Sequence, residues 1–246
     1  EAMDCLREAH VLFGSSATVT KNNVGVVSSE EWVDHLLKKG IIAQMYFLYL
    51  PVNGKGDINL MVTPEQRNHL RKQVIKFRRT KPMFILDFWN DGPHVRGCIA
   101  GGRRYFHINA NGDVEPCVYT HVAMNNSKDV PLATALDSSL FRSIRRRQPH
   151  NENHLRPCMI IDNPQVLRKL VDQYVIPEGH EHADAIIRDP KVVQWADDYS
   201  RRMASLTEPL WEAMINDPGS RWHKEGPDYR EYLRPPVMFG GDRPKE

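Results

Sequence analysis

Residues 41–52 read Ile-Ile-Ala-Gln-Met-Tyr-Phe-Leu-Tyr-Leu-Pro-Val, the longest nearly continuous apolar run of the chain. A membrane-spanning helix needs roughly 18 such residues, so this run is too short to cross a bilayer. Short apolar runs rich in branched and aromatic side chains are typical of strands that are covered on both faces, as in parallel sheets. We therefore expect residues 41–50 to form a buried strand.

A helix is predicted just before this strand. Ser28 is placed to cap it, and Glu31 three residues later completes a capping box. Gly40 is expected to end it. One face is apolar and should be buried, through Trp32, Val33, Leu36 and Leu37.

The same alternation continues on both sides. Thr63 and Pro64 open a second helix that should run to about Lys81, and residues 83–88 read as the next buried strand. Upstream, residues 1–10 read as the end of a helix and residues 11–20 as a strand. Strands that alternate with helices of this length predict β-α-β units and a parallel sheet.

From Asp91 the pattern changes, because glycines and prolines interrupt regular structure. A β-hairpin is predicted over residues 105–117, with Asn111-Gly112 as a two-residue turn. After about residue 165 the chain is helical and polar, and residues 234–241 read as a loop-like tail. The predicted organisation is 1–90, 91–165 and 166–246.

Composition narrows the functional classes. The formal net charge of +2 gives no reason to expect a nucleic-acid or membrane partner. Four cysteines without a secretory signal predict a reducing compartment, the cytoplasm. The chain begins inside a helical pattern and without Met, so we expect it to be part of a longer protein.

The cysteines differ in their surroundings. Cys5 sits in a helix-favouring stretch and is expected to be a small buried apolar residue. Cys98 precedes the hairpin, Cys117 follows it, and Cys158 again stands beside a proline, so the three sulfurs are predicted to converge. Thiolates suit iron–sulfur clusters or zinc, although the paired Cys-x-x-Cys of structural zinc sites is missing. Buried structural thiols are the alternative.

The segments Gly97–Gly102 and Phe106–Cys117 resemble the SPASM/twitch region of radical SAM enzymes, in which a hairpin glycine lies five residues before a cysteine, as Gly112 does before Cys117. The resemblance implies an auxiliary 4Fe-4S cluster on Cys98, Cys117 and Cys158, in the shorter twitch form. Its fourth iron would be open to substrate or bound by another ligand, for which His94 and His107 are candidates.

The resemblance also implies the α/β fold of residues 1–90, as the later part of a partial (β/α) barrel, followed by a small twitch-like hairpin and helix domain and a helical tail. In this superfamily strand ends contact S-adenosylmethionine. Ser16, Thr18 and Asn22 are expected to bind it by hydrogen bonds, with a plain strand-to-loop cap as the alternative. Residues 50–52 would lie beside the adenine.

One family feature is missing from these 246 residues: the Cys-x3-Cys-x2-Cys loop that holds the cluster for cleavage of S-adenosylmethionine. The parent is therefore expected to be an enzyme that carries S-adenosylmethionine and a second 4Fe-4S cluster, and this piece alone is expected to be inactive. A small-molecule or peptide substrate and a reductant such as ferredoxin or flavodoxin are the expected partners.

Three further groups of residues have both a functional and a structural interpretation. The basic residues 142–147 are interpreted as a solvated helix face or as neighbours of the cluster rather than as an RNA-binding patch. His180 and His182, with Glu178, Glu181 and Asp184, are interpreted as surface residues rather than as a metal site. Residues at the end of the last strand are expected to line a substrate pocket, namely Asp87, Trp89, Asn90 and Asp91.

Two main functions stay open from the sequence. The first is the C-terminal portion of a radical SAM enzyme, whose auxiliary cluster contacts substrate or relays an electron. The second is a non-catalytic iron–sulfur or zinc-binding module.

Overall fold

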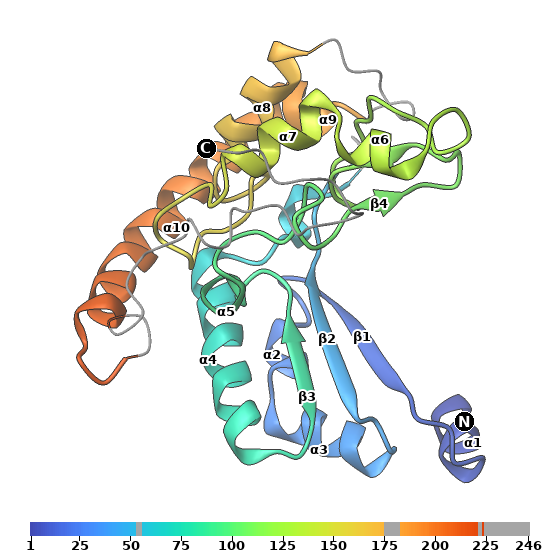
Figure 1. The fold of residues 1–246 in the computed structure, drawn as a ribbon. Coiled ribbons are helices and arrows are strands. Elements are labelled where there is room, and N and C mark those ends of the chain that lie inside the picture. The colour runs from blue at the N-terminus through green and yellow to red at the C-terminus, as the bar shows by residue number, and fades with distance from the viewer. Residues whose placement is uncertain (53–55, 175–182, 221–222, 224–246) are drawn as a thin grey trace.

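The computed structural model describes residues 1–52, 56–174, 183–220 and 223, and shows a mixed α/β protein. Three parallel strands form a sheet in the order β1-β2-β3: β1 (Gly14–Val19), β2 (Ala43–Leu48) and β3 (Phe84–Asp87). The short strands β4 (His107–Ile108) and β5 (Val114–Glu115) pair antiparallel. In Figure 1 the parallel sheet lies in the lower half of the molecule and β4 in the upper half.

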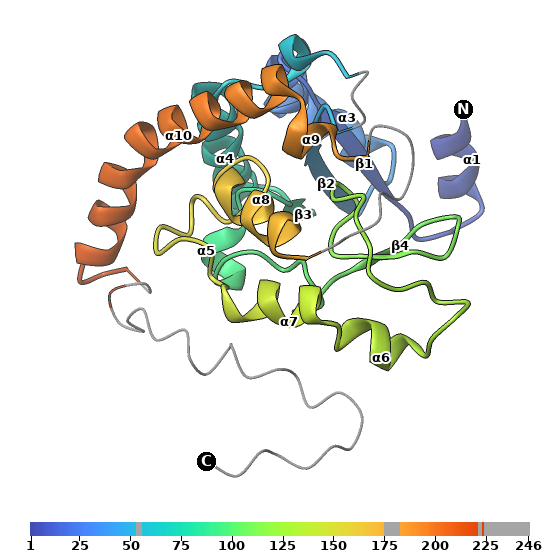
Figure 2. The same ribbon diagram turned by 90° about the horizontal axis from the view of Figure 1, so that it is seen from above.

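Figures 1 and 2 show how the helices are arranged around the strands. Those of the first part are α1 (Ala2–Glu8), α2 (Val24–Val27), α3 (Glu30–Lys38), α4 (Pro64–Thr80) and α5 (Gly92–Val95), with a 3-10 turn η1 (Ile58–Leu60). Those of the second part are α6 (Leu132–Leu136), α7 (Ser139–Arg146), α8 (Pro164–Gln173), α9 (Ala185–Arg188) and α10 (Pro190–Asn216). The long helix α10 packs against α4, α8 and α9.

The order of the parallel strands determines where their helices lie. When successive strands are added in one direction by right-handed crossovers, the connecting helices fall on one face of the sheet. Burial along β2 shows the result: Gln44, Tyr46 and Leu48 are buried, whereas the alternate residues Met45 and Phe47 are only half-buried. The prediction of a strand fully covered on both faces is therefore correct for the helix side only.

Helix α3 starts one residue later than expected. Ser29, not Ser28, is the cap, and its hydroxyl accepts a hydrogen bond from the Trp32 N–H. The Ser28 hydroxyl is already used, because it donates to the Val24 carbonyl at the end of α2. Gly40 ends the helix as predicted, with a φ of +89°.

Helix α4 begins as the sequence predicts. Thr63 and Gln66 form a reciprocal capping box, and Pro64 occupies the first helical position. Its buried stripe includes Leu70, Val74 and Phe77, but also a charged residue, Arg67.

The hairpin differs from the predicted two-residue turn. Only Gly112 has a positive φ, of +94°, and the loop extends over residues 109–113. The side chain of Asn109 accepts hydrogen bonds from the N–H groups of Asn111 and Asp113, so this side chain organises the turn.

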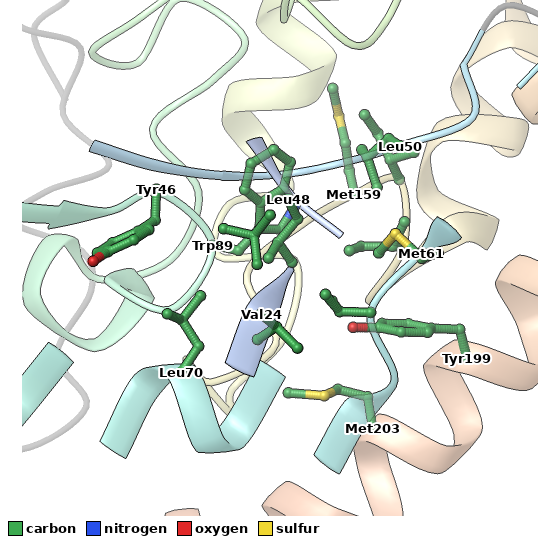
Figure 3. Close-up of a cluster of buried hydrophobic side chains, with 14 of the residues drawn as sticks. Val24, Tyr46, Leu48, Leu50, Met61, Leu70, Trp89, Met159, Tyr199 and Met203 are labelled. Carbon is green, nitrogen blue, oxygen red and sulfur yellow. The ribbon is translucent and has the colours of Figure 1, made fainter. Parts of the chain in front are cut away.

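One large hydrophobic cluster joins the sheet to the second part of the chain. It contains Leu48 and Leu50 beside β2, Met159 after Cys158, and Met203 of α10. Figure 3 shows these side chains among the buried residues of the cluster. The predicted boundaries near residues 90 and 165 stay a prediction, since this cluster includes residues from all three segments.

Three expectations concern the chain ends and surfaces. Cys5 is exposed, so the prediction of a buried core residue is wrong: α1 has no buried residue and lies beyond the start of β1 (Figure 1). The group around His180 and His182, apart from Asp184, and the tail 234–241 lie outside the described residues. Over the part of the chain that the structure describes, none of the helices has both the length and the apolar character needed to cross a membrane.

Candidate metal centre

One cavity of about 210 Å³ is lined by Cys98, Cys117 and Cys158. The first and the last of these cysteines are 60 residues apart along the chain. All three are free thiols in the structure, with Cys117 buried and the other two half-buried. The predicted convergence of the three side chains is therefore observed.

Cys98 is placed by a loop of unusual backbone. The preceding Arg96 and Gly97 have φ values of +57° and +100°, and Gly101 and Gly102 follow with +69° and +74°. A Cβ at Gly101 would lie 2.2 Å from Cγ2 of Ile144, so only glycine permits this loop to pack on α7.

Cys117 follows β5 and is tied to the first loop through the backbone. The Gly101 N–H donates to the carbonyl of Pro116 at 2.8 Å, which joins the two cysteine loops directly. The Val118 N–H donates to the Tyr105 hydroxyl at 3.0 Å. The hairpin thus brings its returning strand against the residues that follow Cys98.

Cys158 lies in a compact turn built around Asp162. Its N–H donates to Oδ2 of Asp162 at 3.0 Å, and its carbonyl accepts from the N–H groups of Asp162 and Asn163. Gly92, at the start of α5, approaches this turn so closely that a Cβ would lie 2.2 Å from the His154 carbonyl oxygen. The turn is therefore held from within and from α5.

Two of the cysteine sulfurs accept a hydrogen bond from the backbone N–H two residues later: Ala100 donates to Cys98 and Ile160 to Cys158, both at 3.4 Å. At Cys117 the backbone N–H of Tyr119 favours the thiolate and so lowers the pKa against the larger effect of burial. An N–H directed at sulfur stabilises the thiolate over the thiol, and hydrogen bonds of this kind tune iron–sulfur clusters. Amide groups directed at sulfur around one cavity favour a site that binds thiolates.

Without a metal, burial keeps these thiols protonated. Burial raises the pKa of Cys98 to about 11 and that of Cys158 to about 12, and it raises the pKa of Cys117 well above its ordinary value. Metal ligation requires the thiolate, so binding iron here would release these protons.

The rest of the cavity wall is apolar. Met45 of β2 and Leu86 of β3 contribute from the open face of the parallel sheet. The ring of Trp89 meets that of Tyr119 edge-on, with centroids 5.0 Å apart. Asp91 also lines the cavity, but its carboxylate is paired with Arg78 at 2.7 Å. Such a wall excludes water, which protects a cluster and lowers the local dielectric constant.

A single metal ion and an iron–sulfur cluster need different arrangements of cysteines. Within the described ranges, no group of three or more His, Cys, Asp or Glu side chains is arranged to hold a metal ion. An iron–sulfur cluster binds each thiolate through a different iron, so its cysteines surround a larger volume than the ligands of one ion do. The three cysteines around an apolar cavity therefore fit a cluster better than a single zinc ion.

The histidines considered as a fourth ligand do not line this cavity. His94 lines a different pocket on the helix side of the sheet. Nδ1 of His107 lies 2.8 Å from Oε2 of the buried Glu115 in the hairpin. Apart from the three cysteines, Met45, Asp91 and Tyr119 are the described cavity-lining side chains with an atom of known metal affinity.

The residues expected to bind S-adenosylmethionine lie outside the cavity. Ser16 and Thr18 are exposed and pair in register with Met45 and Phe47, so they share the open face of the sheet. Asn22 is exposed in the turn after β1. Leu50 and Pro51 are buried beyond the end of β2. The cavity and the open face meet at Met45.

The residues at the end of β3 separate into two groups. Trp89 lines the cysteine cavity and Asp91 lines both this cavity and the pocket on the helix side, whereas Asn90 and Asp87 line the helix-side pocket alone, where Nδ2 of Asn90 donates to Asp87 at 2.7 Å. In the basic segment, Arg142 and Arg145 pair with Asp137, which reduces the free positive charge on α7.

Sequence reasoning missed Arg67 and Asp162. Their side chains form an ion pair of 2.6 Å with no exposed surface. The one signal was periodicity, because Arg67 occupies a position on the apolar stripe of α4 where a charge is unexpected unless it is paired.

Comparisons with known proteins address the same segment. Residues 98–159 match the SPASM family, described as an iron-sulfur cluster-binding domain. The match begins at Cys98, includes Cys117 and ends one residue after Cys158. Neither the search of curated proteins nor the search of solved structures returned a match. The SPASM match thus suggests iron–sulfur cluster binding by the segment that contains all three cavity-lining cysteines.

Proposed function

We propose that this chain binds an auxiliary 4Fe-4S cluster through Cys98, Cys117 and Cys158. The observation that carries the proposal is the cavity: three cysteines from three separate loops line it, and the sulfurs of Cys98 and Cys158 accept hydrogen bonds from the N–H groups two residues later. The SPASM match over these cysteines supports the same chemistry.

The residues around the cavity have separate tasks in this proposal. The cysteines hold the cluster, and the amides of Ala100 and Ile160 stabilise the charge on the sulfurs of Cys98 and Cys158. Arg103 donates to the carbonyls of Cys98 and Val95, both at 2.7 Å, and its positive charge favours the thiolate of Cys98. When bound, the cluster would supply one-electron transfer and an iron open to coordination.

We further propose that the chain is the C-terminal portion of a radical SAM enzyme. Support comes from the β-α units with helices on one face, and from the hydroxyls of Ser16 and Thr18 on the open face that meets the cavity at Met45. S-adenosylmethionine would contact Ser16, Thr18 and Asn22, and the parent would supply the second 4Fe-4S cluster. A small-molecule or peptide substrate, a ferredoxin or flavodoxin reductant, and a cytoplasmic location belong to this proposal.

Anaerobic reconstitution with iron and sulfide tests the cluster. We expect an absorption spectrum like that of 4Fe-4S proteins, about four irons per chain by chemical assay, and an EPR signal after reduction. We expect most of the iron to be lost in each of three variants, Cys98→Ala, Cys117→Ala and Cys158→Ala. The reason is that the cavity is lined by three cysteines, so each variant leaves only two thiolates to hold the cluster. Cys5→Ala is the matched control, since Cys5 is exposed and distant in the sequence, and should load normally.

The same assay addresses the zinc alternative. Purified protein that holds stoichiometric zinc, takes up no sulfide and loses zinc in the three cysteine variants would support a zinc-binding module instead. Equal iron in Cys5→Ala and Cys158→Ala would contradict any metal centre at this cavity.

A further inference from the structure

The ion pair between Arg67 and Asp162 joins two parts of the chain that each form one side of the cysteine cavity. Nη1 of Arg67 donates to Oδ1 of Asp162 at 2.6 Å, and Nη2 donates to Oδ2 at 3.1 Å. Both side chains are completely buried. The two-pronged contact with a carboxylate is specific to the planar guanidinium and fixes the orientation of both groups.

On one side, Asp162 holds the Cys158 turn. The Oδ2 atom that accepts from Arg67 also accepts from the backbone N–H of Cys158 at 3.0 Å. The Asp162 N–H returns a bond to the Cys158 carbonyl at 3.1 Å. A displacement of the Asp162 carboxylate therefore moves the backbone of Cys158 directly.

On the other side, Arg67 holds the cavity wall after β3. Its Nε donates to Oδ1 of Asn90 at 3.0 Å, and its Nη2 donates to the carbonyl of Trp89 at 3.1 Å. Trp89 and Cys158 both line the cavity. A single guanidinium thus contacts the residue that orients one cysteine and the residue that forms the aromatic wall.

We infer that Arg67 is a positioning residue for the cluster: through Asp162 it sets the place of Cys158 relative to Trp89 and the parallel sheet. The inference rests on the proposed cluster at Cys98, Cys117 and Cys158. Arg67 touches neither the cavity nor a sulfur, so it acts through Asp162. Second-sphere partners of this kind orient ligands and tune the metal, and their loss typically weakens binding about 10- to 100-fold.

Arg67→Lys is the informative variant. A lysine keeps the charge opposite Asp162 but lacks the planar fork, so it cannot make the contacts with Asp162, Asn90 and Trp89 together. We expect the reconstituted variant to show altered EPR g-values and reduction potential, and to lose iron to a chelator about 10-fold or more faster than wild type.

Arg168→Lys is the matched control. Arg168 of α8 pairs with Asp197 of α10 through two contacts, one of them 3.1 Å, close to the Cys158 turn in sequence but without a bond to it. Its EPR spectrum, potential and rate of iron loss should equal those of wild type, even where its melting temperature falls.

A second variant guards against misfolding of Arg67→Lys. The double variant Arg67→Met with Asp162→Asn removes both buried charges, and buried pairs are often replaced together without loss of folding. The amide oxygen at 162 still accepts the Cys158 N–H, but the link to Asn90 and Trp89 is gone. The same changes in EPR spectrum and iron loss are expected.

The outcomes separate the two proposals. If wild type loads a cluster and either Arg67 variant loads it with unchanged EPR spectrum, potential and chelator kinetics, the positioning role is overturned while the cluster stands. If wild type takes up no iron and sulfide, the proposed function fails and the positioning role fails with it.

Discussion

Cys5 and Cys158 are the same residue type, and their surroundings separate them. Cys5 lies exposed on a helix without buried residues, whereas the sulfur of Cys158 accepts the Ile160 N–H and borders an apolar cavity. A residue's chemistry at this scale depends on desolvation and on the donors directed at it. The same reasoning applies to the buried carboxylates.

Asp87 is a buried carboxylate whose ionisation opposes folding. Burial raises its pKa from the ordinary 3.8 to about 6, and repulsion from Asp91 adds to the effect. The folded state therefore holds the proton more tightly than the unfolded state. The stability from this group is full below about pH 4 and is lost as the pH rises through about 6.

Asp87→Asn should remove this pH dependence. Relative to wild type, the free energy of unfolding of the variant should rise by about 3 kcal/mol between pH 4 and pH 7.5, as expected for a pKa shift of about two units. Urea unfolding of the cluster-free chain at both pH values measures the difference. A constant difference between variant and wild type would show that Asp87 ionises as freely as in an unfolded chain.

Among the elements, the loop after Cys98 packs its backbone at Gly101 directly against the side chain of Ile144 in helix α7. Gly101 combines a φ of +69° with a Cβ direction that meets Ile144. The Gly101→Ala variant should lose about 3 kcal/mol of unfolding free energy, because a side chain there is both strained and overpacked. Urea unfolding gives the stability, and iron content gives the effect on the adjacent Cys98.

Gly25→Ala is the control for that substitution. Gly25 lies in α2, and a Cβ there would meet no atom within 4 Å. The change should be neutral or stabilising by up to about 1 kcal/mol, since alanine is the better helix former. Equal losses at both glycines would contradict the packing argument for Gly101.

At the scale of the whole molecule, one hydrophobic cluster connects the parallel sheet with the cysteine-bearing half. Met159, directly after Cys158, is 1% exposed and belongs to the same cluster as Leu48 of β2. Figure 3 shows the two side chains close together. Such continuity predicts that both halves unfold together.

Met159→Ala tests this cooperativity. The cavity left by truncation should cost about 2–5 kcal/mol. The midpoint of urea unfolding of the cluster-free chain should fall by the same amount whether it is followed by tryptophan fluorescence or by far-ultraviolet circular dichroism. Leu132→Ala, at a position that is 39% exposed, should change stability by less than about 0.5 kcal/mol. Separate midpoints for the two probes would indicate that the halves unfold independently.

The sequence alone was sufficient for features that depend on neighbours along the chain. The capping box of Thr63, the end of α3 at Gly40 and the alternation of strands and helices were all predicted, because each depends on bonds within a few residues. The hairpin and the prolines predicted that Cys98, Cys117 and Cys158 converge, whereas their role as cluster ligands was implied by the resemblance to the SPASM/twitch region.

The tertiary structure decided what depends on residues far apart. The ion pair of Arg67 and Asp162 joins positions 95 residues apart, and no local pattern specifies such a partner. The strand order leaves one face of β2 only half-buried. Cys5 is exposed because α1 lies beyond the sheet. Local hydrogen bonds are encoded in neighbouring residues, whereas burial and pairing of charges depend on how the whole chain packs.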